Sequence, residues 1–264
     1  MSDLDRNYAS PFGRAATGRT DAAAVDAGLR SYMLKIYNYM SIGLAITGLA
    51  ALGLYMAAVT TDTTAAAGKI GSVLLTSFGV ALFVSPLKWL FMLAPLVMVF
   101  AISFGINRLR PSTAQMLFWV FSALMGISLS SIFLVYTHAS IVRVFFITAA
   151  SFGALSLYGY TTKRDMTGMG SFLMMGLFGI IIASLVNIFV ASSMLQFIVS
   201  VVGVLIFAGL TAWDTQRLKN DYIYGYAAQG GDIAEKAAIT GALSLYLNFI
   251  NLFTLLLQLL GQRD

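Results

Sequence analysis

Seven runs of about 20 apolar residues, separated by short polar segments, dominate the sequence. A helix of that length crosses the roughly 30 Å hydrocarbon core of a bilayer and satisfies its own backbone hydrogen bonds there. The runs cover residues 36–59, 87–106, 114–135, 141–160, 169–190, 194–213 and 237–260. Only 10% of the residues are charged, whereas about a quarter are charged in a soluble domain. The pattern predicts an all-α, polytopic membrane protein built as a seven-transmembrane-helix bundle.

The segments outside the runs have separate predictions. Residues 1–30 are polar, rich in Ala and Gly, and without apolar periodicity, so they are predicted to form a flexible cytoplasmic tail that becomes helical from about Ala22. Residues 31–264 form the membrane domain. The first apolar run follows too long and too acidic a segment to be a signal peptide. Residues 70–84 are apolar but short, and are predicted either to lie at the membrane interface or to extend the second span past Pro86.

The basic residues predict the orientation of the bundle. Of the 16 Lys and Arg residues, all but four lie on the N-terminal side of a seven-span topology. The four on the other side are Lys69, Lys88, Arg143 and Arg263. The positive-inside rule therefore places the N-terminus in the cytoplasm and the C-terminus outside. Trp213 falls at the end of a run, as an interfacial aromatic residue does.

Composition argues against most kinds of catalytic site. The chain has no cysteine and a single histidine, His138, which excludes disulfides, thiolate chemistry and histidine metal clusters. A serine protease needs a histidine base beside its serine, but His138 lies in a short loop with no evident serine partner. Metalloprotease and phosphate-loop motifs are absent. We therefore expect no enzymatic activity, no cofactor and no nucleic-acid partner.

Asp214 is the acidic residue that adjoins an apolar run with no turn signal in between, in the stretch VLIFAGLTAWDTQRLK (residues 204–219). A charged carboxylate at the centre of a membrane helix costs about 2.5–3.5 kcal/mol, so an acidic residue there indicates a functional site. The alternative is an aspartate at a helix end, at the headgroup level, stabilised by water and by Arg217 three residues on. The stretch alone leaves both interpretations open.

The seventh run carries a polar stripe on one helical face. Asn248 and Asn251 are three residues apart, and Ser244 lies one turn before Asn248. The stripe must face protein or water, so it predicts either interhelical hydrogen bonds or the lining of a pore. Arg108, at the end of the second run, is predicted to share a membrane level with Asp214. Two interpretations of Arg108 are open: it is a salt-bridge partner of Asp214, or it is an ordinary membrane anchor.

Three stretches occur in order along the chain, with the expected spans between them: FGALSLYGYTTKRDMTGMG (152–170), AGLTAWDTQRLK (208–219) and ALSLYLNFINLFTLLLQLLG (242–261). Together they resemble the transmembrane Bax inhibitor motif family, and the resemblance covers about residues 30–261. It implies a multi-pass protein of the bacterial inner membrane, with six helices around a central seventh. It also implies calcium leak across the membrane and a part in stress responses and cell death.

The resemblance further implies a gate of two aspartates, on the sixth and seventh spans, with an arginine from the second. Asp214 matches the first aspartate and Arg108 the arginine, but Asn248 stands where the family has the second aspartate. Adjacent carboxylates share a proton, whereas an amide donates a hydrogen bond and cannot titrate. We therefore expect a weakened acid switch. Calcium binding should also be weaker, because calcium prefers several charged oxygens.

Two hypotheses follow. In the first, the protein is an inner-membrane leak channel for cations, with calcium as the transported ion, Asp214 as gate and calcium ligand, and Arg108 as latch. Ser244, Asn251 and Arg217 are then expected to line the pore or support it. In the second, the protein conducts nothing and regulates a membrane protease or another stress-response partner through its tail. Asp214→Asn should change flux only under the first hypothesis, and deletion of residues 1–30 should matter only under the second.

Overall fold

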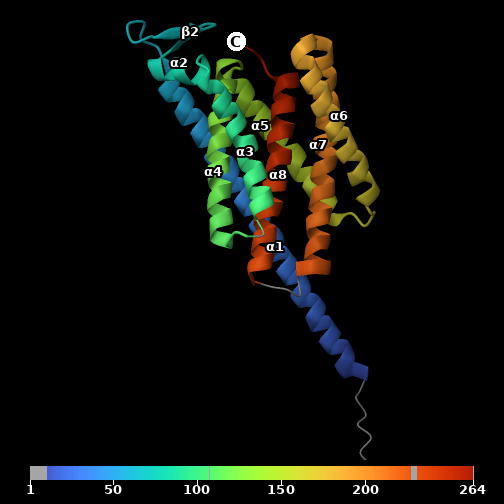
Figure 1. The fold of residues 1–264 in the computed structure, drawn as a ribbon. Coiled ribbons are helices and arrows are strands. Elements are labelled where there is room, and N and C mark those ends of the chain that lie inside the picture. Colours follow the sequence, from blue (N-terminus) through green and yellow to red (C-terminus); the bar gives the residue numbers. More distant parts are fainter. Residues whose placement is uncertain (1–10, 107, 227–230, 264) are drawn as a thin grey trace, which may run out of the picture.

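The computed structural model describes the backbone of residues 11–106, 108–226 and 231–263 and side chains from Val25 onward (Figure 1). The helices are α1 (Pro11–Ala58), α2 (Ser77–Phe83), α3 (Leu87–Gly105), α4 (Pro111–Leu129), α5 (His138–Thr161), α6 (Thr167–Val190), α7 (Ser193–Asp221) and α8 (Gly231–Leu260). A 3₁₀ turn (Ser130–Leu134) follows α4, and a π-helical turn (Tyr222–Tyr226) follows α7. Within this part of the chain, every helix except α2 is long and apolar enough to cross a membrane. The predicted seven-span, all-α fold is confirmed.

The first helix begins much earlier than the first apolar run. Residues 11–30, part of the predicted tail, form the first turns of α1, which project beyond the bundle (Figure 1). Proline is favoured in a first helical turn and alanine has the highest helix propensity, which explains this early start. Leu29 and Tyr32 are already buried in the bundle. Residues 1–10 of the predicted tail lie outside the described part of the chain.

A small sheet and a short helix connect α1 to α3. The strands β1 (Val59–Thr60), β2 (Gly68–Ile70) and β3 (Val73–Leu75) form an antiparallel sheet in the order β1-β3-β2. Gly71, with a φ of 57°, makes the tight turn between β2 and β3. Residues 70–84 therefore do not extend the second span. That alternative is wrong because the chain breaks between α2 and α3 at Pro86.

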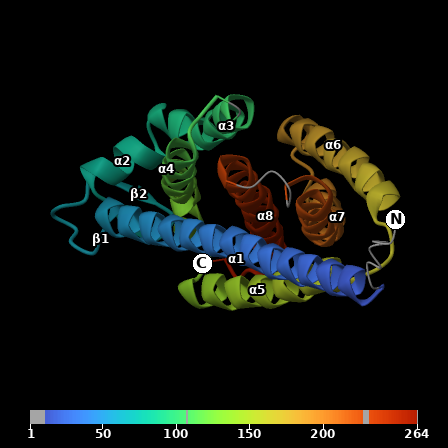
Figure 2. The same ribbon diagram turned by 90° about the horizontal axis from the view of Figure 1, so that it is seen from below.

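Helix α8 lies at the centre of the bundle, as the family resemblance implied (Figure 2). It packs against α1, α4, α5 and α7. Tyr246 is fully buried, and its ring meets the rings of Phe118 and Phe121 edge-on at 5.7 and 5.5 Å. Its hydroxyl lies 2.6 Å from the Thr47 hydroxyl of α1. Tyr246 thus connects α8 to α4 through the aromatic rings and to α1 through Thr47.

The C-terminal end of α8 is tied to the beginning of α5. The backbone N–H of Thr137 donates to the carbonyl of Gln262 at 3.0 Å, and the N–H of Gln262 donates to the Ser140 hydroxyl at 2.9 Å. The Arg263 guanidinium lies 5.8 Å from the centre of the Tyr136 ring. The two described ends of the chain lie at opposite ends of the bundle, as an odd number of spans requires (Figure 1). The cytoplasmic location of the N-terminus stays a prediction.

Candidate functional site

Asp214 lies inside a helix, not at its end. Helix α7 continues to Asp221, two turns past the aspartate, and the Asp214 residue is only 4% exposed. The apolar run ends at residue 213 because it marks only the hydrophobic part of a longer helix. The helix-end part of the alternative interpretation is therefore wrong, whereas the contact with Arg217 that it expected is present. A buried carboxylate needs hydrogen-bond donors or an ion-pair partner, and the surrounding side chains supply both.

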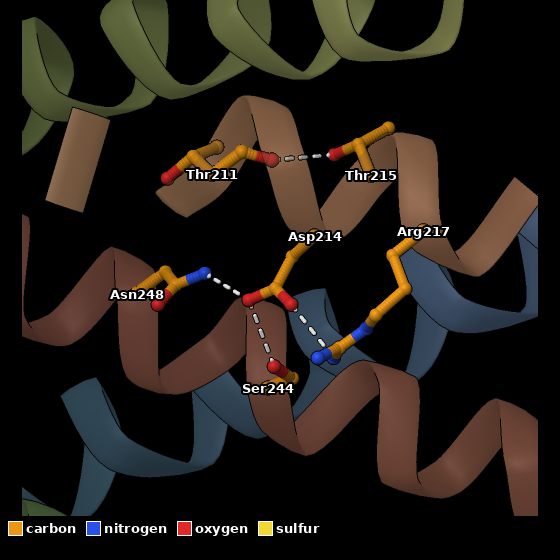
Figure 3. A network of polar contacts seen from close by, with 6 residues as sticks. All are labelled: Thr211, Asp214, Thr215, Arg217, Ser244 and Asn248. Atoms are coloured by element: carbon orange, nitrogen blue, oxygen red, sulfur yellow. Dashed lines mark hydrogen bonds and ion pairs between the residues drawn. The ribbon is translucent and has the colours of Figure 1, made fainter. Parts of the chain in front are cut away.

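Two hydrogen-bond donors and one ion-pair partner surround the Asp214 carboxylate (Figure 3). The Asn248 amide donates to Oδ2 at 2.7 Å, and the Ser244 hydroxyl donates to the same oxygen at 2.9 Å. Both come from α8, where their four-residue spacing places them on one face. The other oxygen, Oδ1, lies 2.6 Å from Nη2 of Arg217, which is three residues along α7. Asn248 therefore donates to Asp214 in the way the sequence predicted for an amide at this position.

Arg108 does not take part in this cluster. It is exposed in the connection between α3 and α4, and no ion pair joins it to Asp214 among the residues described. Helix α3 ends at Gly105, and the chain then turns, with the N–H of Arg108 donating to the Gly105 carbonyl. The predicted latch between Arg108 and Asp214 is therefore not formed in this structure. Arg217 has that place, because a spacing of three residues brings it to the same carboxylate.

Two neighbours of Asp214 in the WDTQ stretch, Trp213 and Gln216, connect α7 to other parts of the structure. The Arg217 guanidinium stacks over the Trp213 ring, 4.7 Å from its centre, and Trp213 packs against Gly170 of α6, where no side chain would fit. Gln216 is buried and clasps the α5–α6 connection: its amide donates to the Arg164 carbonyl at 2.7 Å, and its carbonyl accepts from the Met166 N–H at 3.0 Å. Sequence reasoning missed both roles. A packed tryptophan and an interfacial one look alike in sequence.

A cavity of about 660 Å³ extends from Asp214 between α6, α7 and α8, and is called the α6–α8 cavity below. Its α6 wall is almost entirely apolar. Its α8 wall is polar over five positions on one face, namely Ser244, Asn248, Asn251, Thr254 and Gln258. The Gln258 carbonyl accepts a hydrogen bond from Ser200 of α7 at 2.9 Å. The polar stripe predicted on the seventh span therefore lines a cavity, and it continues two positions beyond those that the sequence indicated.

The cluster is not a preformed metal centre. No group of three or more His, Cys, Asp or Glu side chains that could hold a metal occurs in the described part of the chain. Both carboxylate oxygens of Asp214 are engaged, one by Arg217 and one by Ser244 and Asn248. A cation that uses this carboxylate must therefore displace Arg217. What the arrangement offers is a buried carboxylate that faces a partly polar cavity and is paired with a partly exposed arginine.

Comparisons with known proteins agree with this architecture. The family model of the inhibitor of apoptosis-promoting Bax1 matches residues 29–264. A protein of Caulobacter vibrioides is 45% identical over 264 residues, covering 99% of this chain and 98% of the relative. A protein of Rickettsia prowazekii is 46% identical over 239 residues, with 90% and 92% covered. The inner membrane protein YbhL of Escherichia coli is 43% identical over 239 residues, with 90% and 94% covered.

These matches confirm the resemblance found in the sequence and extend it to the last residue. The match to an inner membrane protein over most of its length, together with seven membrane-length helices, confirms the predicted location in the bacterial inner membrane. The chain is thus a multi-pass inner-membrane protein, and it belongs to the Bax inhibitor family.

Proposed function

We propose that the protein is a cation leak channel of the inner membrane, with calcium as its cation, and that the conduction path passes Asp214. The observation that carries this proposal is a carboxylate, 4% exposed, that faces a cavity of about 660 Å³ inside a membrane bundle. An ionisable residue in the membrane is costly, and a bundle that conducts nothing does not need one. On the predicted orientation, Asp214 lies toward the cytoplasmic end of the path.

The α8 wall of the cavity supports a path rather than a single contact. Hydrogen bonds between two helices require a few polar residues, whereas the polar positions here recur over four turns, from Ser244 to Gln258. Hydroxyl and amide oxygens are ligands that calcium accepts. With one carboxylate among them, they would bind calcium weakly. Weak binding suits conduction, because an ion must leave the site as readily as it enters.

The test is calcium flux into proteoliposomes that contain the native chain or Asp214→Asn. The variant keeps the shape of the side chain and removes its charge, so flux should fall to the level of empty liposomes. Asp232→Asn is the matched control, because Asp232 is exposed at the beginning of α8, away from the cavity, and its loss should leave flux unchanged. Equal flux in the native protein and Asp214→Asn would contradict the proposal.

An absence of flux from folded native protein would instead favour the second hypothesis, a regulator that binds a membrane protease or stress-response partner. The deletion that tests it should end at residue 24, not at residue 30. Leu29 is buried, so a longer deletion would damage the bundle as well as the projecting part of α1.

A further inference from the structure

A second cavity lies beside the first, and Arg217 lines both. This end cavity, of about 520 Å³, lies where α7 ends and α8 begins. Its walls include Tyr32, Asp221 and Thr240, and among the described residues Arg217 is the one that lines both this cavity and the α6–α8 cavity. The Arg217 side chain is 40% exposed, whereas that of its partner Asp214 is 5% exposed. The Arg217 side chain thus lies between the end cavity and the buried carboxylate.

In this structure Arg217 is held on the Asp214 side. Its guanidinium makes the 2.6 Å contact with Asp214 Oδ1 and stacks on Trp213. Within a helix, a pair with the acid on the N-terminal side of the base is the more favourable order, because it agrees with the helix dipole. Asp214 precedes Arg217, so this contact should be the resting one. This contact neutralises the carboxylate and places the Arg217 side chain at the boundary of the two cavities.

The end cavity contains a second place for the same guanidinium. Asp221 lies four residues after Arg217, which is the other spacing that brings two side chains together on a helix. The Tyr32 hydroxyl, on a residue only 6% exposed, has no hydrogen-bond partner among the described residues. Asp221 and Tyr32 both line the end cavity together with Arg217. A guanidinium has five N–H donors, so it can bind a carboxylate and a hydroxyl together.

We propose that Arg217 is the movable barrier of the path: it closes the passage when paired with Asp214 and opens it by turning to Asp221 and the Tyr32 hydroxyl. The turn frees Oδ1 of Asp214 for a cation and joins the two cavities. Asp221 follows Arg217 along the helix, which is the less favourable order, so the open position is the minor one. This inference rests on the proposed function, because a barrier matters only if the path conducts ions. Its test, however, does not require conduction.

The absence of cysteine from the native sequence allows a test that does not depend on conduction. Asn251→Cys places a single thiol in the α6–α8 cavity, and Thr240→Cys places one in the end cavity. Each is labelled in sealed vesicles with a membrane-impermeant, charged thiol reagent added on the side of the end cavity. The rate at position 240 reports that the protein is folded and the side is correct. The rate at position 251 reports the passage past Arg217.

Arg217→Gln should raise the labelling rate at position 251 by about tenfold, the ratio that corresponds to about 1.4 kcal/mol in an equilibrium. Asp221→Asn should lower that rate severalfold, because it removes the open-state partner. Lys219→Gln is the control: Lys219 is on the same helix, lines neither cavity, and donates instead to the Tyr160 carbonyl. Thr254→Cys replaces Asn251→Cys if the latter does not fold, since Thr254 lines the same cavity.

A rate at position 251 that is unaffected by Arg217→Gln, or by Asp221→Asn, would overturn the proposal. Calcium flux measured on the same vesicles separates this failure from failure of the channel hypothesis. Flux that depends on Asp214, with labelling indifferent to Arg217, would refute the barrier alone. Labelling that follows the prediction, without flux, would refute conduction and leave Arg217 as a barrier between two water-filled cavities.

Discussion

Helix α8 has two faces that differ in their surroundings: one packs against other helices, and the other borders a cavity. Tyr246 points into a cluster of aromatic rings and is fully buried, whereas Asn248, two residues on, points to the opposite side and bonds Asp214. The first face packs against α1, α4 and α5. The second borders a cavity of about 660 Å³. Stability and activity should therefore be separable in this helix, with substitutions on one face affecting the fold and substitutions on the other affecting flux.

The largest effect on stability is expected from Tyr246→Ala. Removing a fully buried aromatic ring leaves a cavity and costs about 3–5 kcal/mol. The thermal midpoint of the detergent-solubilised protein should fall by many degrees, whereas Tyr224→Ala, at a position 86% exposed, should leave it nearly unchanged. Similar midpoints for the two variants would mean that the packed face does not stabilise the bundle as described.

A smaller loss is expected where two backbones touch behind the site. A Cβ on Gly159 of α5 would lie inside the van der Waals contact of the Ala212 carbonyl on α7, so Gly159→Ala must push the helices apart, at a cost of about 1–3 kcal/mol. Gly153, on the same helix, has open space around it. Gly153→Ala should therefore be neutral or slightly stabilising. The comparison is made by thermal unfolding, and equal shifts would contradict the close α5–α7 contact.

On the polar face, Asn248→Asp should add a pH response with little change in stability. It places a second carboxylate beside Asp214, and two adjacent carboxylates share a proton and repel each other once both are ionised. Calcium flux should then rise with pH between about pH 6 and 8, whereas the native protein is expected to have a shallow profile. Asn251→Asp, one turn further along, is the control. A steep native profile that Asn248→Asp leaves unaltered would refute the expected effect of the amide.

The smallest effect is expected at Asp165, which is exposed in the α5–α6 connection and belongs to neither face. Hydrogen bonds from the Thr167 hydroxyl and N–H hold the pKa of Asp165 below its ordinary value. A lowered pKa in the folded state adds stability above the unfolded value of about 4, and that contribution is lost as pH falls through the folded-state pKa. Asp165→Asn should thus lower the thermal midpoint slightly at neutral pH and not at all in acid. An equal difference at both pH values would contradict this account.

The same division explains what the sequence could and could not predict. Hydropathy located the seven spans because membrane crossing requires length and apolarity, and four-residue spacing on one helix placed Ser244 beside Asn248. The partner of Asp214 was harder to predict. Arg108 and Arg217 both lie at span ends, and only the turn of the chain after Gly105 decides that Arg108 points away.

The sheet between α1 and α2 was missed for another reason. Its strands are two or three residues long, too short for any alternation of polar and apolar residues to be recognised. The clasp of Gln216 on the α5–α6 connection was missed because a buried glutamine that bonds backbone atoms has no spacing signature.

The contacts between the last residues and the start of α5 bear on how α8 can move. A rod that is pinned at one end pivots there, and its displacement grows with distance from the pivot. Helix α8 is about 45 Å long, and Asn248 lies roughly 18 Å from the pinned end, so a tilt that shifts Gly231 by several ångströms shifts Asn248 by less than half as much. Such a tilt would loosen the hydrogen bonds to Asp214 while the pinned end of α8 keeps its contacts with α5. A reporter protein fused directly after residue 264 would disturb the contacts between Gln262 and the start of α5. It is better attached at the N-terminus.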